Sequence, residues 1–495
     1  MRLSLVALSL LGMTLAACQP RGALDPSLTL EAWIGHGDLV GAEVLVIRGS
    51  EIILHEAYGW KDREAGVPMQ THSIYSLASL TKPVTALAVL MLVDEGALSL
   101  DDPVSRYIPD VGGDPRATVR DLLGHTSGDG GEHGSHGYNV YDFATLAEWV
   151  DDWAPTESTA EYGQFKYSNF NYAALGYIVE QVSGIELGEF VTSRILRPLA
   201  MNDSYVSFSP DSSWADRVPV SYMWSAETER YEIFWTPDQP QRWRFFPATL
   251  GLWGTAADYA RFMALWLDLG VKDGRRLVSE ELVRVALQPQ GFLGDEPICG
   301  LGWFVDPLRT EEDMPSIFRH GGGDGTLGLA YPADRGIVVY LSQSERPPDH
   351  VAAFQNYIAM SGFFSQPGPY MLWAATAEIE AVPLSEGQRS EVTGTYRGTS
   401  FRGDEVTWEV EVRTDGGVLE LAMGEADLLL RDRVHLVPIG DDTFTYGRYE
   451  DGVLVGIDSL TRVKLLRADG AVNAIEVSFA GEPEFLVTRV GDVPS

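Results

Sequence analysis

The spacing of apolar residues predicts strands near the start of the chain and a long helix soon after them. Apolar residues alternate or run together over residues 44–47 and 52–58, on either side of a Gly-Ser pair, which predicts a β-hairpin. Over residues 79–95 they recur at helical spacing, so we expect an amphipathic helix that ends at Gly96. The expected buried face of that helix consists of Val84, Leu87, Ala88, Met91 and Leu92.

The same two periodicities recur as far as residue 364. Helical spacing is found at residues 142–153, 170–182, 187–196, 256–269 and 279–287, with a short helix at 30–34. Strand-like runs are found at residues 300–305, 328–331 and 336–342. Strands that flank a helix-rich middle are typical of an α+β fold, which we expect over residues 30–364.

The tail of the chain has a different pattern. A Pro- and Gly-containing stretch punctuates the chain after residue 364, so a linker is expected over residues 365–391. Short β-rich runs separated by Asp-Gly turns then predict an antiparallel barrel or sandwich over residues 392–495. The runs lie at residues 406–413, 418–423, 428–436, 443–448, 453–457, 462–466 and 473–479.

Length, charge and cysteine content narrow the class of protein. A chain of 495 residues is long enough for two folded units. The net charge of −35 would repel phosphates, so no nucleic-acid partner is expected. The same charge disfavours electrostatic attachment to an anionic membrane. Cys18 and Cys299 are the two cysteines, and Cys299 lies in an apolar run expected to be a buried strand, so no intramolecular disulfide is predicted.

The first residues have the layout of an export signal. Arg2 supplies positive charge, residues 3–15 form a short apolar run, and Leu15-Ala16-Ala17-Cys18 follows directly. That tetrapeptide resembles a bacterial lipobox, in which the cysteine is acylated and becomes the first mature residue. We therefore expect a signal peptide at 1–17, lipid attachment at Cys18, a tether at 18–29 and a place in the bacterial cell envelope, anchored to a membrane by lipid. The alternative is an ordinary leader that is cleaved nearby.

A serine and a lysine three residues apart are the candidate nucleophile and base. Ser79-Leu80-Thr81-Lys82 begins the expected helix, so Ser79 and Lys82 lie about one turn apart on one face. The free N–H groups at a helix start favour negative charge on the serine oxygen. A desolvated lysine has a lowered pKa and can accept the serine proton. On this tetrapeptide alone, a helix cap followed by a solvent-exposed lysine would be the better interpretation.

Two further motifs favour the catalytic interpretation. Tyr167-Ser168-Asn169 precedes the helix expected at residues 170–182. A phenol beside ammonium groups can act as a base, and an asparagine can hold a substrate carbonyl. His320-Gly321-Gly322-Gly323 precedes the strand expected at 328–331. Glycines let a substrate approach the backbone and leave N–H groups free for an oxyanion, although a glycine run alone would indicate only a turn.

The order of these motifs resembles that of the serine β-lactamase and penicillin-recognising superfamily, in its class C branch. That branch includes class C β-lactamases, DD-carboxypeptidases, D-aminopeptidases and related esterases. The resemblance implies a β-lactamase/transpeptidase-like fold, with an antiparallel sheet flanked by helices and a helix-rich subdomain. The tail resembles the lipocalin-like β-domain that often follows this fold. Further blocks that fit in the same order are residues 94–104, 122–128, 197–201, 251–258 and 300–303.

The resemblance also implies a role for each motif residue. Ser79 would be the acylated nucleophile, and Lys82 and Tyr167 would share the work of the general base. Asn169 would bind the carbonyl side of the substrate. The backbone N–H groups of Ser79 and Gly323 would form the oxyanion hole. The mechanism needs neither a metal ion nor a cofactor.

The third motif departs from that of the true β-lactamases. His320 and Gly322 are expected to contact the substrate, but His320 stands where β-lactamases have the lysine of Lys-Thr-Gly, and Gly321 lacks the threonine hydroxyl. That lysine and that hydroxyl help to hold the carboxylate of a β-lactam. The departures therefore favour the peptidase and esterase branches.

The sequence leaves more than one function open. The leading hypothesis is hydrolysis of an amide or ester through an acyl-enzyme on Ser79. The substrate would be a small molecule or peptide: a D-amino-acid peptide, a peptidoglycan fragment or a small ester. The alternative enzyme is a genuine β-lactamase, and the alternative of another class is a non-catalytic, cell-wall-binding lipoprotein.

Other conspicuous residues are assigned to structure. His125 lies in the Leu-Leu-Gly-His-Thr-Ser-Gly block and is expected to be structural. The His- and Gly-containing residues 130–137 are expected to form a surface loop near the site. The aromatic residues between 222 and 246 are expected to pack in a core or hairpin, with an apolar substrate wall as the alternative.

Overall fold

The computed structural model describes most of the chain between residues 30 and 490. Outside the described residues lie 1–29, 32, 36, 38, 110–113, 129–139, 154–160, 226, 229, 294–295, 307–309, 311, 346–350, 352–353, 356–357, 359–362, 365–372, 375–383, 401–406, 416–417, 424–433, 441, 451–452, 459–460, 469, 480–481 and 491–495. The expected signal peptide, tether and Cys18, and the loop at 130–137, fall in those gaps.

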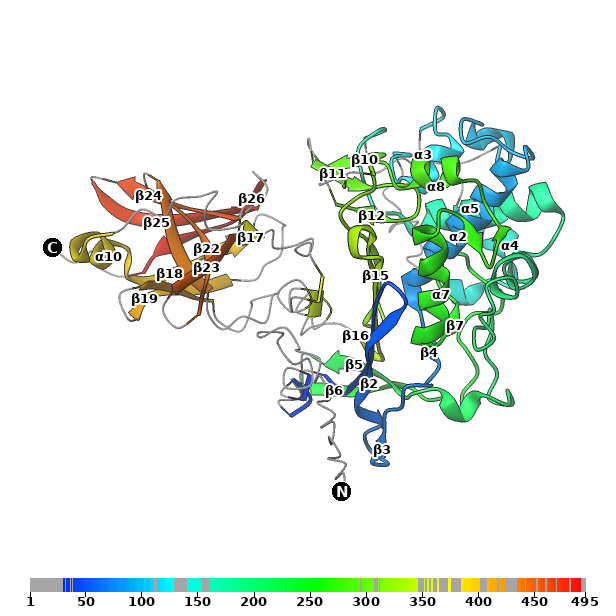
Figure 1. Cartoon of the computed structure of the whole chain (residues 1–495), viewed down its shortest axis with the longest axis horizontal. Coiled ribbons are helices and arrows are strands. Elements are labelled where there is room, and N and C mark those ends of the chain that lie inside the picture. Colours follow the sequence, from blue (N-terminus) through cyan, green and yellow to red (C-terminus); the bar gives the residue numbers. More distant parts are fainter. Residues whose placement is uncertain are drawn as a thin grey trace, which may run out of the picture.

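A nine-stranded antiparallel sheet is the centre of the first unit (Figure 1). The expected hairpin and the strands from the second half of the unit join side by side, because β1 pairs with both β2 and β15. In spatial order the strands are β10 (Gly291–Leu293), β11 (Glu296–Cys299), β12 (Phe304–Val305), β13 (Phe318–Gly322), β14 (Thr326–Tyr331), β15 (Gly336–Ser342), β1 (Gly41–Arg48), β2 (Glu51–Asp62) and β3 (Val67–Pro68).

Both faces of this sheet are buried. Successive side chains of a strand point to opposite faces, and β15 shows the consequence. Val339 and Leu341 belong to the large core shared with the helices, whereas Val338 and Tyr340 belong to a second core that includes Leu30, Phe354 and Ile358. A strand buried on both faces reads as a continuous apolar run, which is what residues 336–342 show.

The helices gather on one side of the sheet in Figure 1 and share the larger core. Helix α7 lies directly on β14, where Tyr259 and Met263 of the helix leave no room for a side chain at Gly328. The α-helices of the first unit are α2 (Thr81–Asp94), α3 (Val119–Leu123), α4 (Leu146–Trp153), α5 (Asn169–Ser183), α6 (Leu187–Val191), α7 (Ala256–Leu267) and α8 (Glu280–Ala286). Shorter turns are η1 (Ala78–Leu80), η2 (Val104–Arg106), η3 (Val140–Asp142), η4 (Thr192–Leu196), η5 (Ala215–Arg217) and η6 (Pro332–Asp334).

Helix α2 differs from expectation in its surroundings. The sequence predicted one apolar face, but every residue from Thr81 to Leu92 is buried. A helix that is apolar all round belongs in the interior of a protein, and α2 lies there. Its end agrees with the expectation, because Gly96 adopts a left-handed conformation (φ 70°) just beyond it.

Small strand pairs complete the first unit. The aromatic stretch forms a hairpin, as expected, in which Tyr222 and Tyr231 are buried. The pairs are β5 (Ser221–Ser225) with β6 (Arg230–Trp235), β16 (Ser344–Glu345) with β5, β4 (Tyr75–Ser76) with β7 (Trp253–Gly254), and β8 (Val271–Lys272) with β9 (Arg275–Arg276).

The C-terminal unit is an antiparallel barrel, one of the two forms expected. Strand β22 pairs with β24 as well as with β21, which joins the two ends of the run β22-β21-β20-β19-β18-β26-β25-β24. The strands are β17 (Trp373–Ala374), β18 (Gly394–Ser400), β19 (Thr407–Asp415), β20 (Val418–Met423), β21 (Val434–Gly440), β22 (Thr443–Glu450), β23 (Val453–Asp458), β24 (Thr461–Ala468), β25 (Ala471–Phe479) and β26 (Glu482–Arg489).

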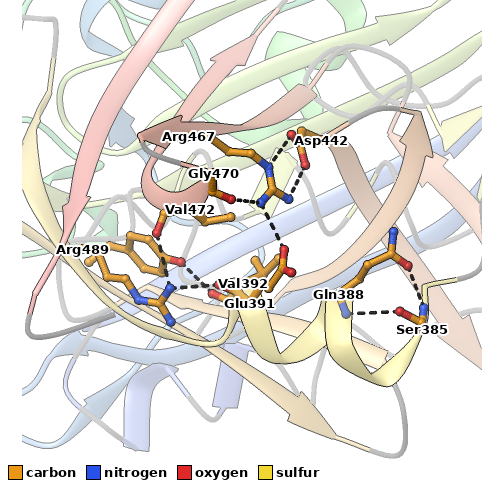
Figure 2. A network of polar contacts seen from close by, with 10 residues as sticks. Ser385, Gln388, Glu391, Val392, Asp442, Arg467, Gly470, Val472 and Arg489 are labelled. Carbon is orange, nitrogen blue, oxygen red and sulfur yellow. Dashed lines mark hydrogen bonds and ion pairs between the residues drawn. The ribbon is translucent and has the colours of Figure 1, made fainter. Parts of the chain in front are cut away.

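Helix α10 (Glu386–Val392) lies in the range expected to be a linker and is joined to this barrel (Figure 2). Arg467 of β24 binds Asp442 through two hydrogen bonds of 2.7 and 2.8 Å and reaches Glu391 of the helix at 3.1 Å. Arg489 of β26 donates to the carbonyl oxygens of Glu391 (2.9 Å) and Thr393. Arg489 thus satisfies carbonyl groups that the end of the helix leaves free, and Arg467 pairs with a carboxylate at the same end.

Candidate active site

Ser79 lies on a strained turn that leads into the buried helix α2. Ala78, the residue before it, has a φ of 45°, a left-handed conformation that costs a non-glycine residue about 1–2 kcal/mol. Two hydrogen bonds of Leu77 fix the start of this turn. Leu77 donates its N–H to the carbonyl oxygen of Leu252 (2.9 Å), and its own carbonyl accepts from Thr326 Oγ1 (3.1 Å). The turn therefore presents Ser79, which is half-buried, at a fixed place beside β14.

Lys82 reaches back to Ser79 from the first turn of α2. Its Nζ lies 2.9 Å from Ser79 Oγ and 3.0 Å from the carbonyl oxygen of Thr249. The side chain is fully buried, and this burial holds the pKa of the amine well below its ordinary value. Within the described residues, no carboxylate forms an ion pair with Lys82 to oppose that effect. A neutral amine at this distance can accept the serine proton.

Tyr167 lies against the same amine, as the sequence predicted. Lys82 Nζ is 4.9 Å from the centre of the Tyr167 ring, close enough for a cation–π contact whenever the amine is protonated. Tyr167 comes just before α5, whose N-cap is Ser168, with its Oγ accepting the N–H of Asn171. Asn169 is the half-buried first residue of α5, so the three members of the Tyr-x-Asn motif adjoin the start of one helix.

The third motif occupies the end of a strand. The sequence placed His320-Gly321-Gly322 in front of a strand, whereas these residues themselves form the end of β13, paired with β14 through His320↔Gly328 and Gly322↔Thr326. At Gly322 the strand touches the Ser79 turn. A Cβ there would lie 2.8 Å from Leu77 O and 3.1 Å from Ala78 Cβ, and would collide with Thr326 Oγ1. Glycine at 322 therefore allows the close approach of strand and turn.

Ser79 and Gly323 offer the backbone N–H groups expected for an oxyanion hole. Within the described part of the chain, neither N–H donates to a protein group. Gly323 is exposed, and a Cβ built on it would meet no atom within 4 Å, so the space beside it is open. Gly322, which directly precedes Gly323, lies against Leu77 and Ala78 of the Ser79 turn, so the segments that carry the two N–H groups adjoin each other.

His320 is buried and neutral. Its Nδ1 lies 2.7 Å from the carbonyl oxygen of Gly321. Because a carbonyl only accepts, Nδ1 carries the proton and Nε2 is left as an acceptor. Burial, and then the nearby Lys82 charge, lower the pKa of His320 to about 3. The ring packs against Phe304 (5.3 Å between centroids) and Tyr167 (6.3 Å).

The fold also brings to this site residues for which no role was predicted. Thr249 supplies the carbonyl oxygen that binds Lys82, and the preceding Ala248 is held at φ 67°. Phe304 packs against the rings of both Tyr167 and His320. The contact of Thr249 is made by the backbone, so its side chain carries no sequence signal for it. Phe304 follows Trp303 of a family block and could have been noticed only as an aromatic residue near that block.

The described residues contain neither a candidate metal site nor a helix that could span a membrane. No group of three or more His, Cys, Asp or Glu side chains there is arranged to hold a metal ion. Among the same residues, none of the helices has both the length and the apolar character needed to cross a membrane. Cys299 is a buried free thiol at the end of β11, as the sequence predicted.

Comparison with known proteins agrees with this geometry. The Beta-lactamase family model matches residues 27–359, which contain all three motifs. The chain belongs to the Beta-lactamase family. Among its relatives, esterase EstB of Burkholderia gladioli is 37% identical over 339 residues, covering 60% of this chain and 84% of EstB. Penicillin-binding protein 4* of Bacillus subtilis is 27% identical over 405 residues, covering 77% of this chain and 85% of its own.

Solved structures extend the likeness of fold to the C-terminal barrel. The octameric penicillin-binding protein homologue from Pyrococcus abyssi aligns with a TM-score of 0.57 and 23% identity, covering 93% of this chain and 99% of its own. SurE aligns with the same TM-score and identity over 94% and 98%. Both alignments cover more than the hydrolase fold alone.

We predict that Gly322→Ala lowers the turnover of an ester substrate about 100-fold, because the new methyl group must push β13 away from the Ser79 turn by a fraction of an ångström to an ångström. The measurement is kcat for a p-nitrophenyl ester, together with the midpoint of thermal unfolding. Gly321→Ala is the matched control, since its Cβ would meet only Thr326 O, at an ordinary 3.7 Å. Equal activity of the two variants would contradict the role given to Gly322.

Proposed function

We propose that this Beta-lactamase-family serine hydrolase cleaves ester or amide bonds through an acyl-enzyme formed on Ser79. The observation that carries the proposal is the 2.9 Å contact between Ser79 Oγ and Lys82 Nζ, with an amine whose pKa is lowered by burial. A non-catalytic binding protein would gain nothing from burying an amine without a carboxylate partner, which is costly to stability. The contact therefore favours the enzyme over the cell-wall-binding module.

Acylation follows from the positions of these groups. Ser79 Oγ attacks the substrate carbonyl carbon while its proton passes to Lys82, with Tyr167 beside the amine to share the transfer. The backbone N–H groups of Ser79 and Gly323 stabilise the negative charge that develops on the carbonyl oxygen. The proton then returns to the leaving group as the tetrahedral intermediate collapses. Asn169 orients the acyl side of the substrate.

Deacylation reverses the same steps with water as the nucleophile. Lys82 or Tyr167 takes a proton from the water, which attacks the acyl carbon, and Ser79 Oγ regains a proton as the ester breaks. Because Lys82 has no carboxylate partner among the described residues, it returns readily to the neutral form after each proton transfer. The proposed cycle uses side chains and backbone N–H groups of this chain together with water.

The neutral His320 favours substrates without a carboxylate in the third-motif position. A lysine there would be a permanent cation, whereas His320 offers an acceptor at Nε2 and no charge near neutral pH. EstB is an esterase by name, and penicillin-binding protein 4* is named for binding penicillin. We therefore propose esterase or peptidase activity on a small neutral ester or a peptide, including a D-amino-acid peptide or peptidoglycan fragment, in preference to β-lactamase activity.

We further propose that the protein works in the bacterial cell envelope, held to a membrane by lipid on Cys18. The basis is the leader pattern that ends in Leu15-Ala16-Ala17-Cys18. Lipid attachment supplies membrane affinity without a spanning helix.

Ser79→Ala is expected to abolish turnover and to change the free energy of unfolding by no more than about 1 kcal/mol, the size of one lost hydrogen bond. Intact-mass spectrometry after brief exposure to a fluorophosphonate should show one adduct, mapped to Ser79 by peptide analysis. The Ala variant should remain unlabelled. An adduct on another serine, with Ser79 unmodified, would remove the basis of the mechanism.

The role of His320 predicts a substrate preference that does not change with pH. The wild type should hydrolyse a neutral p-nitrophenyl ester with a higher kcat/KM than nitrocefin, and the ratio should stay flat between about pH 5 and about pH 8, because a ring with a pKa of about 3 does not charge in that range. The His320→Lys, Gly321→Thr double variant should shift the ratio toward nitrocefin. A wild-type kcat/KM for nitrocefin near the diffusional ceiling of about 10⁸ M⁻¹s⁻¹ would instead identify a true β-lactamase.

The anchor is tested by fractionation of expressing cells. The wild-type protein should enter the detergent phase, since its acyl chains are apolar, whereas Cys18→Ala should stay unprocessed or appear in the aqueous phase. Cys299→Ser is the control, because it changes the other cysteine and should leave partitioning unaltered. Recovery of wild-type protein wholly in the aqueous phase, cut elsewhere, would refute lipid attachment.

A further inference from the structure

His125 holds the backbone on both sides of Tyr167. Its carbonyl oxygen accepts the N–H of Lys166 at 2.8 Å, and its Nδ1 accepts the N–H of Ser168 at 3.0 Å. The N–H groups of the two residues on either side of Tyr167 are thus bound to one residue, whose exposed fraction is 2%. The same two segments of the chain are joined by one more hydrogen bond, from the N–H of Gly163 to the carbonyl oxygen of Thr126 (2.9 Å).

The imidazole ring of His125 also supports the phenol ring itself. The two ring centres are 4.6 Å apart and the planes are inclined by 32°. Aromatic rings at this separation are in packing contact and limit each other's rotation. Lys82 Nζ lies 4.9 Å from the same Tyr167 ring, so the ring contacts both the imidazole and the amine with which it is proposed to exchange a proton. A change of tilt at Tyr167 would alter its distance to Ser79.

The protonation state of His125 suits this role. Because Nδ1 accepts an N–H, the proton of the neutral ring is on Nε2. Protonation of Nδ1 would set two donors against each other and place a second cation near Lys82. Burial, with help from the Lys82 charge, holds the pKa of His125 well below its ordinary value. The ring therefore stays neutral and keeps its acceptor.

The backbone of His125 is itself in an uncommon conformation. Its φ is 57°, in the left-handed region that histidine, asparagine and aspartate adopt more readily than other non-glycine residues. That conformation turns the carbonyl and the side chain of one residue toward the same segment. Strain of this kind persists where the surroundings enforce it and is concentrated at functional sites.

We propose that His125 is a positioning residue that fixes Tyr167 for proton transfer with Ser79 and Lys82. This goes beyond the structural role expected from the sequence, and it rests on the base function proposed for Tyr167. If His125 acts in this way, replacing it should slow catalysis only by displacing Tyr167. A purely structural residue would instead affect the stability of the whole fold.

The test is single-turnover acylation of Ser79 by a p-nitrophenyl ester in His125 variants. His125→Ala and His125→Phe both remove the acceptor for Ser168 N–H, and we expect the acylation rate to fall about 100-fold with KM within about threefold, as for a catalytic group displaced by an ångström. His125→Asn should recover most of the rate, to within about tenfold of wild type. Its Oδ1 can replace Nδ1 as the acceptor, and asparagine tolerates a positive φ.

A double-mutant cycle separates positioning from stability. In a Tyr167→Phe background, His125→Ala should lower the residual rate by less than about threefold, because groups that act as one unit are non-additive. Thr126→Val is the matched control. Thr126 directly follows His125. Its replacement removes a partly buried hydrogen bond to Asp121 (3.0 Å) and should lower the midpoint of thermal unfolding without changing acylation.

The possible failures are distinguishable. If Tyr167→Phe acylates at the wild-type rate, the base role of Tyr167 is wrong and the positioning role of His125 falls with it. If Tyr167→Phe is impaired but His125→Ala keeps its rate within about twofold, only the inference about His125 is overturned. It is also overturned if the two losses multiply in the double variant, or if His125→Asn is folded and as slow as His125→Phe.

Discussion

The chemistry of this site depends on a buried amine that has no carboxylate beside it within the described part of the chain. Lys82 is fully enclosed, and its Nζ has Ser79 Oγ and the carbonyl oxygen of Thr249 as hydrogen-bond partners. A carboxylate would stabilise the protonated form and remove its use as a base. Two oxygens and the faces of Tyr167 and Tyr172 stabilise the ammonium less, so burial keeps the pKa of the amine well below its ordinary value.

That arrangement requires backbone conformations that are uncommon for residues other than glycine. Ala78, His125 and Ala248 all have left-handed φ angles. Ala78 and Ala248 directly precede Ser79 and Thr249, which bind the amine, and His125 packs against Tyr167. Such residues cost stability, and they persist because packed neighbours leave them no alternative. The large apolar core around α2 provides those neighbours, since a helix buried on every side cannot shift to relieve strain at its first turn. The extent of that core is therefore part of the explanation of the site.

The motifs in the sequence were sufficient to place the side chains of the site, but not the backbone that completes it. Ser79, Lys82 and Tyr167 were predicted to lie together and do, because each stands at the start of a helix whose periodicity is plain. Thr249 was not predicted, since a carbonyl oxygen has the same chemistry in every residue. His320-Gly321-Gly322 was placed before a strand because glycine weakens any strand pattern. It forms one because Thr326 and Gly328 of β14 provide its partners.

In the C-terminal unit, too, some elements could be predicted from their own residues, whereas others depend on partners that are distant in the sequence. Strands β20, β22 and β25 were predicted near their observed places from short β-rich runs and the turns between them, whereas β18 and β26, which pair with each other, were not. Gly398 of β18 lies so close to Leu486 that no side chain would fit, so the residue that makes the pairing possible also removes the local signal for a strand. Helix α10 was hidden in an expected linker for a related reason, because it depends on Arg467 and Arg489, about eighty and one hundred residues away. Short elements in both units thus exist through partners distant in sequence, and a pattern confined to the element itself cannot reveal them.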